Sequence, residues 1–122
     1  MFNNRPTHKE LTNKIRQARQ LVEQQDVIPM TNEDDIVIQA LDLGYLVDGE
    51  MHEVLCGILD TLNPDDYAGQ RPPQRAYEKQ IKGCELLGFS FFSNRFNCAI
   101  YFKFTISNGS FWLVSLHRDN PA

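Results

Sequence analysis

The chain has 122 residues, of which 42% are hydrophobic and 23% are charged. These values fit one globular domain with its own core, and they exclude a disordered chain. No apolar stretch approaches the roughly 20 residues that a membrane-spanning helix needs, and the N-terminus lacks the apolar segment of a secretory signal. We therefore expect a single domain over residues 1–122, no membrane contact and a cytoplasmic location.

The net charge of −4 is unevenly distributed along the chain. Residues 1–66 contain five Lys and Arg against 13 Asp and Glu, a net charge of −8, whereas residues 67–122 contain seven against three, a net charge of +4. Such asymmetry is typical of proteins in which one surface faces a polyanion, and it also arises when two solvated surfaces differ by chance. The overall negative charge by itself argues against nucleic acid as a partner.

The first predicted element is a helix over residues 8–24. Thr7 and Glu10 have the spacing of a capping box, in which Thr7 caps the helix and Glu10 reaches back. Apolar residues follow at helical spacing. A connector over residues 26–30 comes next and has room for a short strand. We expect the buried face of this helix to contain Leu11, Ile15, Ala18 and Val22.

Two further helices are predicted before residue 64. Thr31 or Asn32 caps the second, which stops at Gly44, and Asp48 caps the third, which ends before Pro64. We expect their buried faces to contain Ile36, Val37, Ala40, Leu41 and Leu43 in the second helix, and Met51, Val54, Leu55, Ile58, Leu59 and Leu62 in the third.

The middle of the chain, residues 63–83, is predicted to be irregular because Pro72-Pro73 interrupts any regular element. Residues 77–82 could form one helical turn. A long loop within a small domain is more often functional than not. Residues 85–92 then have the composition of a strand, and a turn at residues 93–95 leads into the last predicted element.

Residues 99–118 predict a β-hairpin around Asn108-Gly109. A two-residue turn would place His117 on the apolar face, opposite Ile100. A three-residue loop with Gly109 in the left-handed region would instead place Tyr101 opposite Ser115, with His117 as its diagonal neighbour. We expect the second register, because hydrophobic patterning then brings Trp112, Val114 and Leu116 onto the apolar face.

The predicted fold class is therefore α+β, with three N-terminal helices packed on one face of a C-terminal antiparallel sheet of three or more strands. The other face of the hairpin would carry Tyr101, Lys103, Ser115 and His117, and this polar face is the candidate site. The three cysteines lack the spacing of a zinc site and suggest no disulfide framework. We expect no metal and no cofactor.

The order of these parts resembles the MqsR branch of the RelE-like toxins of bacterial toxin–antitoxin systems. The resemblance rests on three short helices, then L-N-P-D-D-Y with a following glycine, an irregular link, a strand with I-Y-F-K-F and a last strand with V-S-L-H. It covers most of the chain in order, and it is best over residues 62–69 and 99–117. Each motif is short, so the ordered set carries more weight than any one of them.

The resemblance implies an α+β fold and a metal-independent endoribonuclease that cleaves messenger RNA and is silenced by a cognate antitoxin protein. By position, Tyr101 matches the family's active-site tyrosine, His117 matches a functional lysine on the last strand, and Tyr67 matches the tyrosine of the loop motif. The lysine expected after that tyrosine is replaced by Ala68. The family's active-site glutamine corresponds to Gln74 or Gln80.

These residue types suit metal-free RNA cleavage, in which a base removes the proton of the 2′-hydroxyl and an acid protonates the leaving 5′-oxygen. Histidine can fill either role, a lysine can stabilise the charge on the phosphate, and a tyrosine can donate a hydrogen bond or stack under a base. We expect Tyr101, His117 and Lys103 to be catalytic. We expect RNA to contact Tyr67, Arg71, Arg75, Lys79, Lys82 and Arg118, with Lys79 or Lys82 replacing the missing lysine.

Two other interpretations remain open. Tyr, Lys, Ser and His also occur on ordinary solvent-facing sheets, so the chain could be a catalytically inactive module that binds a protein partner through its acidic helical half. A small-molecule enzyme is a weaker alternative, because the sequence contains no glycine-rich phosphate loop and no nucleophile elbow.

Overall fold

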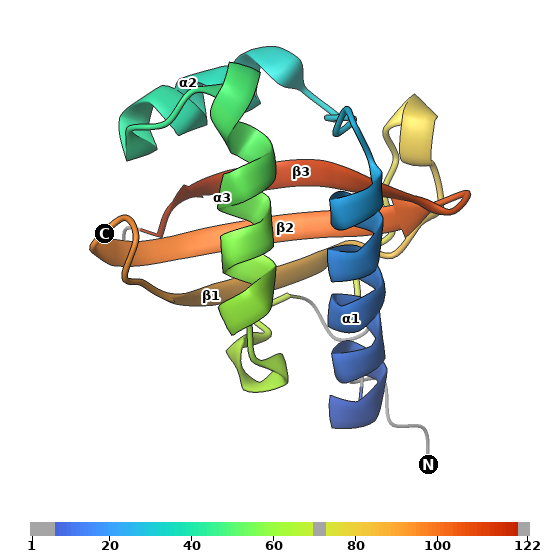
Figure 1. Ribbon diagram of the computed structural model, residues 1–122. Helices are drawn as coiled ribbons and strands as arrows, with labels where there is room; N and C mark the ends of the chain where they lie inside the picture. Colours follow the sequence, from blue (N-terminus) through green and yellow to red (C-terminus); the bar gives the residue numbers. More distant parts are fainter. Residues whose placement is uncertain (1–6, 70–72, 120–122) are drawn as a thin grey trace.

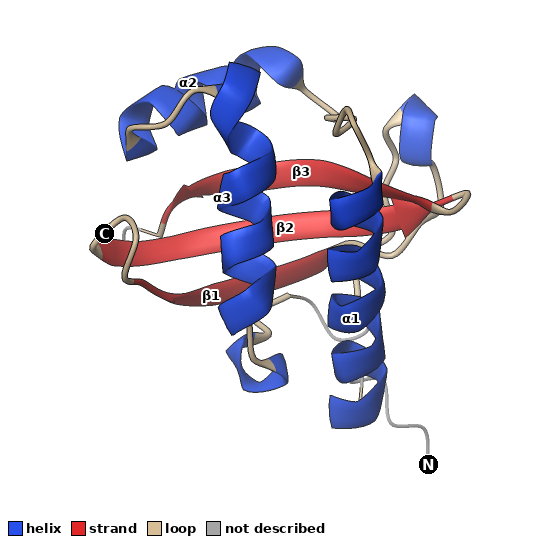
Figure 2. Ribbon diagram, in the orientation of Figure 1, coloured by secondary structure: helices blue, strands red, loops and turns tan. Residues whose placement is uncertain are grey.

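The computed structural model describes residues 7–69 and 73–119. Three helices precede a three-stranded antiparallel sheet of order β1-β2-β3, so the predicted α+β class is confirmed. Figures 1 and 2 show α1 and α3 lying across one face of the sheet, with α2 beyond the β3 side. The elements are α1 (His8–Gln24), α2 (Glu33–Leu43), α3 (Val47–Thr61), β1 (Leu87–Ser93), β2 (Cys98–Ser107) and β3 (Ser110–Arg118), with the 3-10 turns η1 (Pro64–Asp66) and η2 (Lys79–Ile81).

Local capping residues determine where the first two helices begin and end. Thr7 accepts a hydrogen bond from the Glu10 backbone N–H (3.1 Å), and the Thr7 hydroxyl donates to the Glu10 carboxylate (3.2 Å). The predicted bounds of α1 are confirmed. Asn32 caps α2 by accepting from the Asp35 N–H, and Gly44 ends this helix with φ +91°, in the left-handed region.

Two predictions about α2 and α3 are wrong. Ile36, Ala40 and Leu43 of α2 are buried as expected, but Val37 and Leu41 are 40% and 61% exposed. These two residues line an open pocket between α2 and the beginning of α3. Asp48 does not cap α3, because the helix begins at Val47 and then kinks through non-helical backbone at Asp48 and Gly49. The six residues predicted to point inward from the third helix are nevertheless buried, including Leu62, which directly follows α3.

A stack of phenylalanines forms the centre of the core, between the sheet and the helices. Phe104 lies between Phe89 and Phe111, with ring centroids 5.9 and 5.2 Å away, and Phe102 packs beside it. All four are fully buried. Alternate residues of β2 face this core, as the period-2 pattern of a half-buried strand requires.

The hairpin turn differs from the prediction. Ser107 pairs with Ser110, so Asn108-Gly109 is a two-residue turn with φ of +51° and +75°, the backbone that Asn-Gly favours. The three-residue loop is therefore wrong. Phe111 and Leu113 lie in the main core, whereas Trp112 does not.

A β-bulge then changes the register within β3. Phe104 pairs with Leu113, but Lys103 pairs with Ser115, so Val114 is the extra residue. Beyond it the parity of β3 is reversed, and Leu116 joins the main core as predicted while Val114 does not. The bulge is the reason that His117 faces away from the core although the turn has only two residues.

Residues 73–86 cover part of the opposite face of the sheet. Ala76, Ile81 and Leu86 form a small second core, against which Trp112 and Val114 pack. The predicted helical turn within residues 77–82 is present as η2. This segment leaves the end of the sheet that carries Tyr101 and His117 uncovered.

The outer backbone edge of β3 is occupied at several residues, and that of β1 is occupied at Gly88 and Phe89. On β3, the Phe111 N–H donates to Gln25 (2.7 Å), the Leu116 N–H donates to Gln39 (3.0 Å), and Leu113 bonds to the backbone of residues 29–31. On β1, Tyr67 bridges to Phe89 and the Ala68 N–H donates to the Gly88 carbonyl (2.8 Å), while residues 74–75 bond to residues 85–86, which precede the strand. The contacts to Phe111, Leu113 and Leu116 interrupt the row of donors and acceptors that an added strand would need at the β3 edge.

Alanine substitutions at Leu113 and Val114 test the pairing of β2 with β3. Leu113→Ala removes a fully buried side chain and should lower the free energy of unfolding by about 2–5 kcal/mol. Val114→Ala truncates a half-buried side chain and should cost about 1 kcal/mol. Urea unfolding measures both. A larger loss for Val114 than for Leu113 would contradict the pairing of Leu113 with Phe104, which places Leu113 in the core.

Candidate functional site

The candidate site lies on the face of the sheet that points away from α1 and α3. Tyr101 on β2 pairs directly with His117 on β3, and Lys103 pairs with Ser115. The predicted pairing of Tyr101 with Ser115 is therefore wrong, because Ser115 lies opposite Lys103, two residues along the same face. The correction brings Tyr101 and His117 closer, because they are now direct rather than diagonal neighbours.

The three predicted catalytic side chains form one cluster. The Tyr101 and His117 rings are tilted by 34° with centroids 5.5 Å apart, and the Lys103 Nζ lies 5.9 Å from the Tyr101 ring centroid. All three side chains are half-buried, so each has an accessible part. A base, a hydrogen-bond donor and a cation are therefore within reach of one small ligand group.

A backbone contact orients the His117 ring. Its Nδ1 lies 2.7 Å from the Arg118 carbonyl oxygen, which can only accept, so Nδ1 carries the proton in this contact. In the neutral ring the lone pair is then on Nε2. That nitrogen has the chemistry of a proton acceptor.

Gly88 has no side chain and so leaves room for the Tyr101 ring to lie across the sheet surface. A Cβ at Gly88 would overlap the Tyr101 hydroxyl, so the phenol lies directly over this part of β1. Burial raises the pKa of Tyr101, and the nearby Asp119 carboxylate raises it further. At neutral pH the phenol is therefore protonated and can donate a hydrogen bond.

Sequence reasoning missed Gly88, Ser90 and Asp119. Ser90 pairs with Tyr101 from the β1 side, and its hydroxyl donates to the Asp119 carboxylate. The Asp119 N–H in turn donates to the Ala99 carbonyl (2.9 Å). The alternation of residues 86–92 places Gly88 and Ser90 on the same face of the strand. This pattern assigns them to the site only when the pairing of β1 with β2 is known.

Two of the predicted RNA-contacting residues lie elsewhere. Tyr67 is 5% exposed and packs edge-on against Phe89 in the main core, with centroids 5.7 Å apart. Arg118 points to the helix side, where its Nε lies 2.9 Å from the Asp42 carboxylate of α2. Neither side chain is brought to the cluster of Tyr101, Lys103 and His117.

The basic residues of the middle segment lie on the same side of the sheet as the cluster. Arg75, Lys79 and Lys82 are exposed on the segment that covers the Thr105 end of this face, where the Thr105 hydroxyl donates to the Glu85 carbonyl (2.7 Å). Arg75 also donates to the Gly83 carbonyl (2.8 Å). Arg71 lies outside the described residues.

The same segment carries the two candidate glutamines. Gln74 and Gln80 are both exposed, so their positions do not single out one of them. Ala68 is also exposed, and its N–H donates to the Gly88 carbonyl (2.8 Å). The loop is therefore joined by its backbone to the strand that underlies Tyr101.

No protein-family model, curated protein or solved structure matches this chain. Among the described residues, none of the helices is both long and apolar enough to cross a membrane. Residues 7–69 and 73–119 contain no group of three or more His, Cys, Asp or Glu side chains placed to hold a metal ion. The three cysteines are free.

Replacing Asp119 tests the electrostatics of the site. Asp119→Asn should lower the pKa of Tyr101, because it removes a neighbouring negative charge, but the pKa should stay above that of free tyrosine because burial remains. The phenolate absorbance of Tyr101 is obtained by subtracting the titration of a Tyr101→Phe variant in each background. Asp34→Asn, on the exposed side of α2, should leave this pKa unchanged. An unchanged pKa in Asp119→Asn would mean that the carboxylate does not act on the phenol.

Proposed function

We propose that the chain is a metal-independent endoribonuclease that cleaves messenger RNA and acts in the cytoplasm as the toxin of a toxin–antitoxin pair. The observation that carries the proposal is the direct pairing of Tyr101 with His117, with Lys103 beside them on an open sheet face. The sequence resemblance assigned roles to the same tyrosine and to the last-strand position.

The proposed reaction begins at the 2′-hydroxyl of one nucleotide. His117 Nε2 accepts its proton, and the 2′-oxygen attacks the adjacent phosphorus. The bond from phosphorus to the 5′-oxygen breaks, and the Tyr101 phenol donates a proton to that oxygen. The products are a 2′,3′-cyclic phosphate and a free 5′-hydroxyl, and solvent restores both side chains. Lys103 stabilises the negative charge that develops on the phosphate.

The RNA strand would continue from this cluster toward the middle segment. Arg75, Lys79 and Lys82 are exposed there on the same side of the sheet, whereas the acidic residues are concentrated in the helical half. Lysine and arginine contacts to phosphates supply affinity without sequence preference. Arg118 and Tyr67 are left out of this path because of where they lie.

A second candidate function is a catalytically inactive module that binds a protein partner. It is favoured by Asp119, whose carboxylate lies close enough to Tyr101 to act on its pKa and would repel a phosphate bound there. It is favoured also by the net charge of −8 over residues 1–66.

Cleavage of a structured messenger RNA by the purified chain in the presence of a chelator tests the proposal. We expect His117→Ala to lower the cleavage rate by about 100-fold or more and Tyr101→Phe by about tenfold or more. His8→Ala, which replaces an exposed histidine at the start of α1, is the matched control and should cleave like the parent. The products should end in a cyclic phosphate.

The outcomes separate the two candidate functions. Equal cleavage by the parent and by His117→Ala would place the activity in another site or in a contaminant, and it would refute the proposed mechanism. Cleavage only after ribosomes are added would keep the mechanism and show that the ribosome positions the RNA. A folded parent that is inactive with and without ribosomes would favour the binding module.

A further inference from the structure

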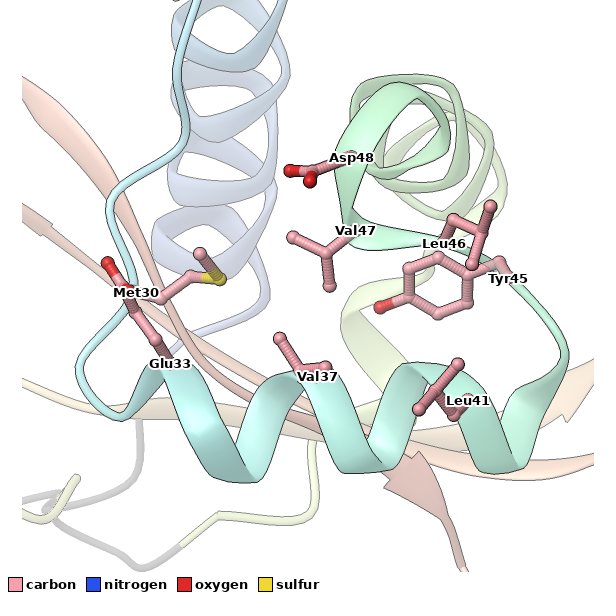
Figure 3. A pocket seen from close by; sticks show the side chains of 8 residues that line it. All are labelled: Met30, Glu33, Val37, Leu41, Tyr45, Leu46, Val47 and Asp48. Carbon is pink, nitrogen blue, oxygen red and sulfur yellow. The ribbon is translucent and has the colours of Figure 1, made fainter.

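An open apolar groove lies between α2 and the beginning of α3. Figure 3 shows its walls, which are Val37 and Leu41 on one side, Leu46 and Val47 on the other, and Met30 at one end. Its volume is about 350 Å³. A second hollow of about 310 Å³ adjoins it, shares Met30 and Val47, and includes Val27. Together they form one depression, which we call the α2–α3 groove.

The groove exposes side chains that a folded protein normally buries. Leu41, Leu46 and Val27 are 61%, 56% and 79% exposed, and the first two lie opposite one another. Contiguous exposed apolar surface of this kind is typical of interaction sites. The sequence pattern predicted Val37 and Leu41 to be buried, but they remain exposed because the groove separates them from Leu46 and Val47.

A buried polar atom lies beside this apolar surface. Tyr45 is 2% exposed, and its hydroxyl points between Val37 and Val47 toward the groove (Figure 3). Among the described residues this hydroxyl has no hydrogen-bond partner. A buried hydroxyl without a partner costs free energy, so a partner side chain that reached it would gain a hydrogen bond.

The carboxylates at the groove are not matched by Lys or Arg among the described residues that line it, and His52 of the adjoining hollow contacts the Val22 carbonyl through its Nε2. Glu33 and Asp48 line its first part, and Figure 3 shows both beside Met30 and Val47. Asp26 lines the adjoining hollow. Lys and Arg are absent from the described residues that line either part. A ligand that complements this surface is therefore apolar on one side and positively charged at its flanks.

We propose that the α2–α3 groove binds an amphipathic helix of a partner protein, with apolar side chains in the groove and Lys or Arg residues opposite Glu33, Asp48 and Asp26. A helix fits better than a strand. Its backbone hydrogen bonds are satisfied internally, and the nearby edge of β3 is already occupied by Gln25, Gln39 and residues 29–31. The proposal goes beyond the proposed ribonuclease activity and does not rest on it, because the groove is on the helix side of the sheet.

A displayed library of 18-residue helical peptides, with randomised apolar stripes and flanking positions, tests the proposal on the full chain. We expect selection to enrich peptides with apolar residues at i, i+3, i+4 and i+7 and a net positive charge. Leu41→Gln should weaken the binding of the selected peptides, measured with synthetic copies, tenfold or more. Ile38→Gln is the matched control, because Ile38 is exposed on α2 but does not line the groove, and it should change binding less than twofold.

Further variants measure separately what the carboxylates and the Tyr45 hydroxyl contribute to peptide binding. The double variant Glu33→Gln, Asp48→Asn should weaken binding at least threefold and reduce its salt dependence, whereas Asp34→Asn, in the same helical turn but outside the groove, should not. Tyr45→Phe should leave the melting temperature unchanged or higher, because it removes an unpartnered buried hydroxyl. The same variant should bind more weakly to peptides that carry a hydrogen-bonding residue at the centre of their apolar stripe.

Three results would overturn the proposal. These are an absence of enriched helices, enrichment of acidic or uncharged ones, and winners that bind Leu41→Gln as tightly as the parent. Sedimentation of the chain alone at high concentration checks the other occupant. A dimer that Leu41→Gln disrupts would assign the groove to a second copy of this chain and would refute the partner helix.

Discussion

The bulge at Val114 is the constraint on which the two-sided character of the sheet depends. The Asn108-Gly109 turn sets one register and buries Phe111 and Leu113. Continued to the end of β3, that register would place His117 in the core and Leu116 in solvent. One extra residue reverses the parity, so the strand supplies the core on both sides of the bulge and still presents His117 beside Tyr101.

This device shows what could be predicted from the sequence and what could not. The helices and the fold class follow from spacing and capping residues, which are local: Thr7 and Gly44 end up where their chemistry requires. The face of His117 was predicted correctly, but from a three-residue loop that does not exist. Two compensating one-residue shifts cannot be separated by patterning alone, because Phe111 and Leu113 are as apolar as Trp112 and Val114.

The other differences between expectation and structure concern contacts between elements that are distant in the chain. Val37 and Leu41 have the spacing of a buried face, and only the position of α3 shows that an open groove separates them from the nearest element. Arg118 follows His117 directly, yet alternation sends it to the other side of the sheet, where Asp42 receives it. Tyr67 matched a motif but fills the core beside Phe89. Periodicity identifies which residues can be buried, and packing decides which ones are.

The charge asymmetry of the chain acquires a spatial meaning in the fold. Part of the basic excess of residues 67–122 is paired with the acidic helices, since Arg95 lies 3.9 Å from Glu50 and 3.4 Å from Glu53, and Arg118 bonds to Asp42. Exposed pairs of this kind add little stability, but they neutralise arginines that would otherwise face solvent. Positive charge therefore remains on the open sheet face and its covering segment, and within residues 7–69 and 73–119 no ion pair compensates Glu33, Asp48 or Asp26 at the α2–α3 groove. A polyanion and a basic helix would accordingly be attracted to opposite sides of one small domain, so that occupancy of one surface need not block the other.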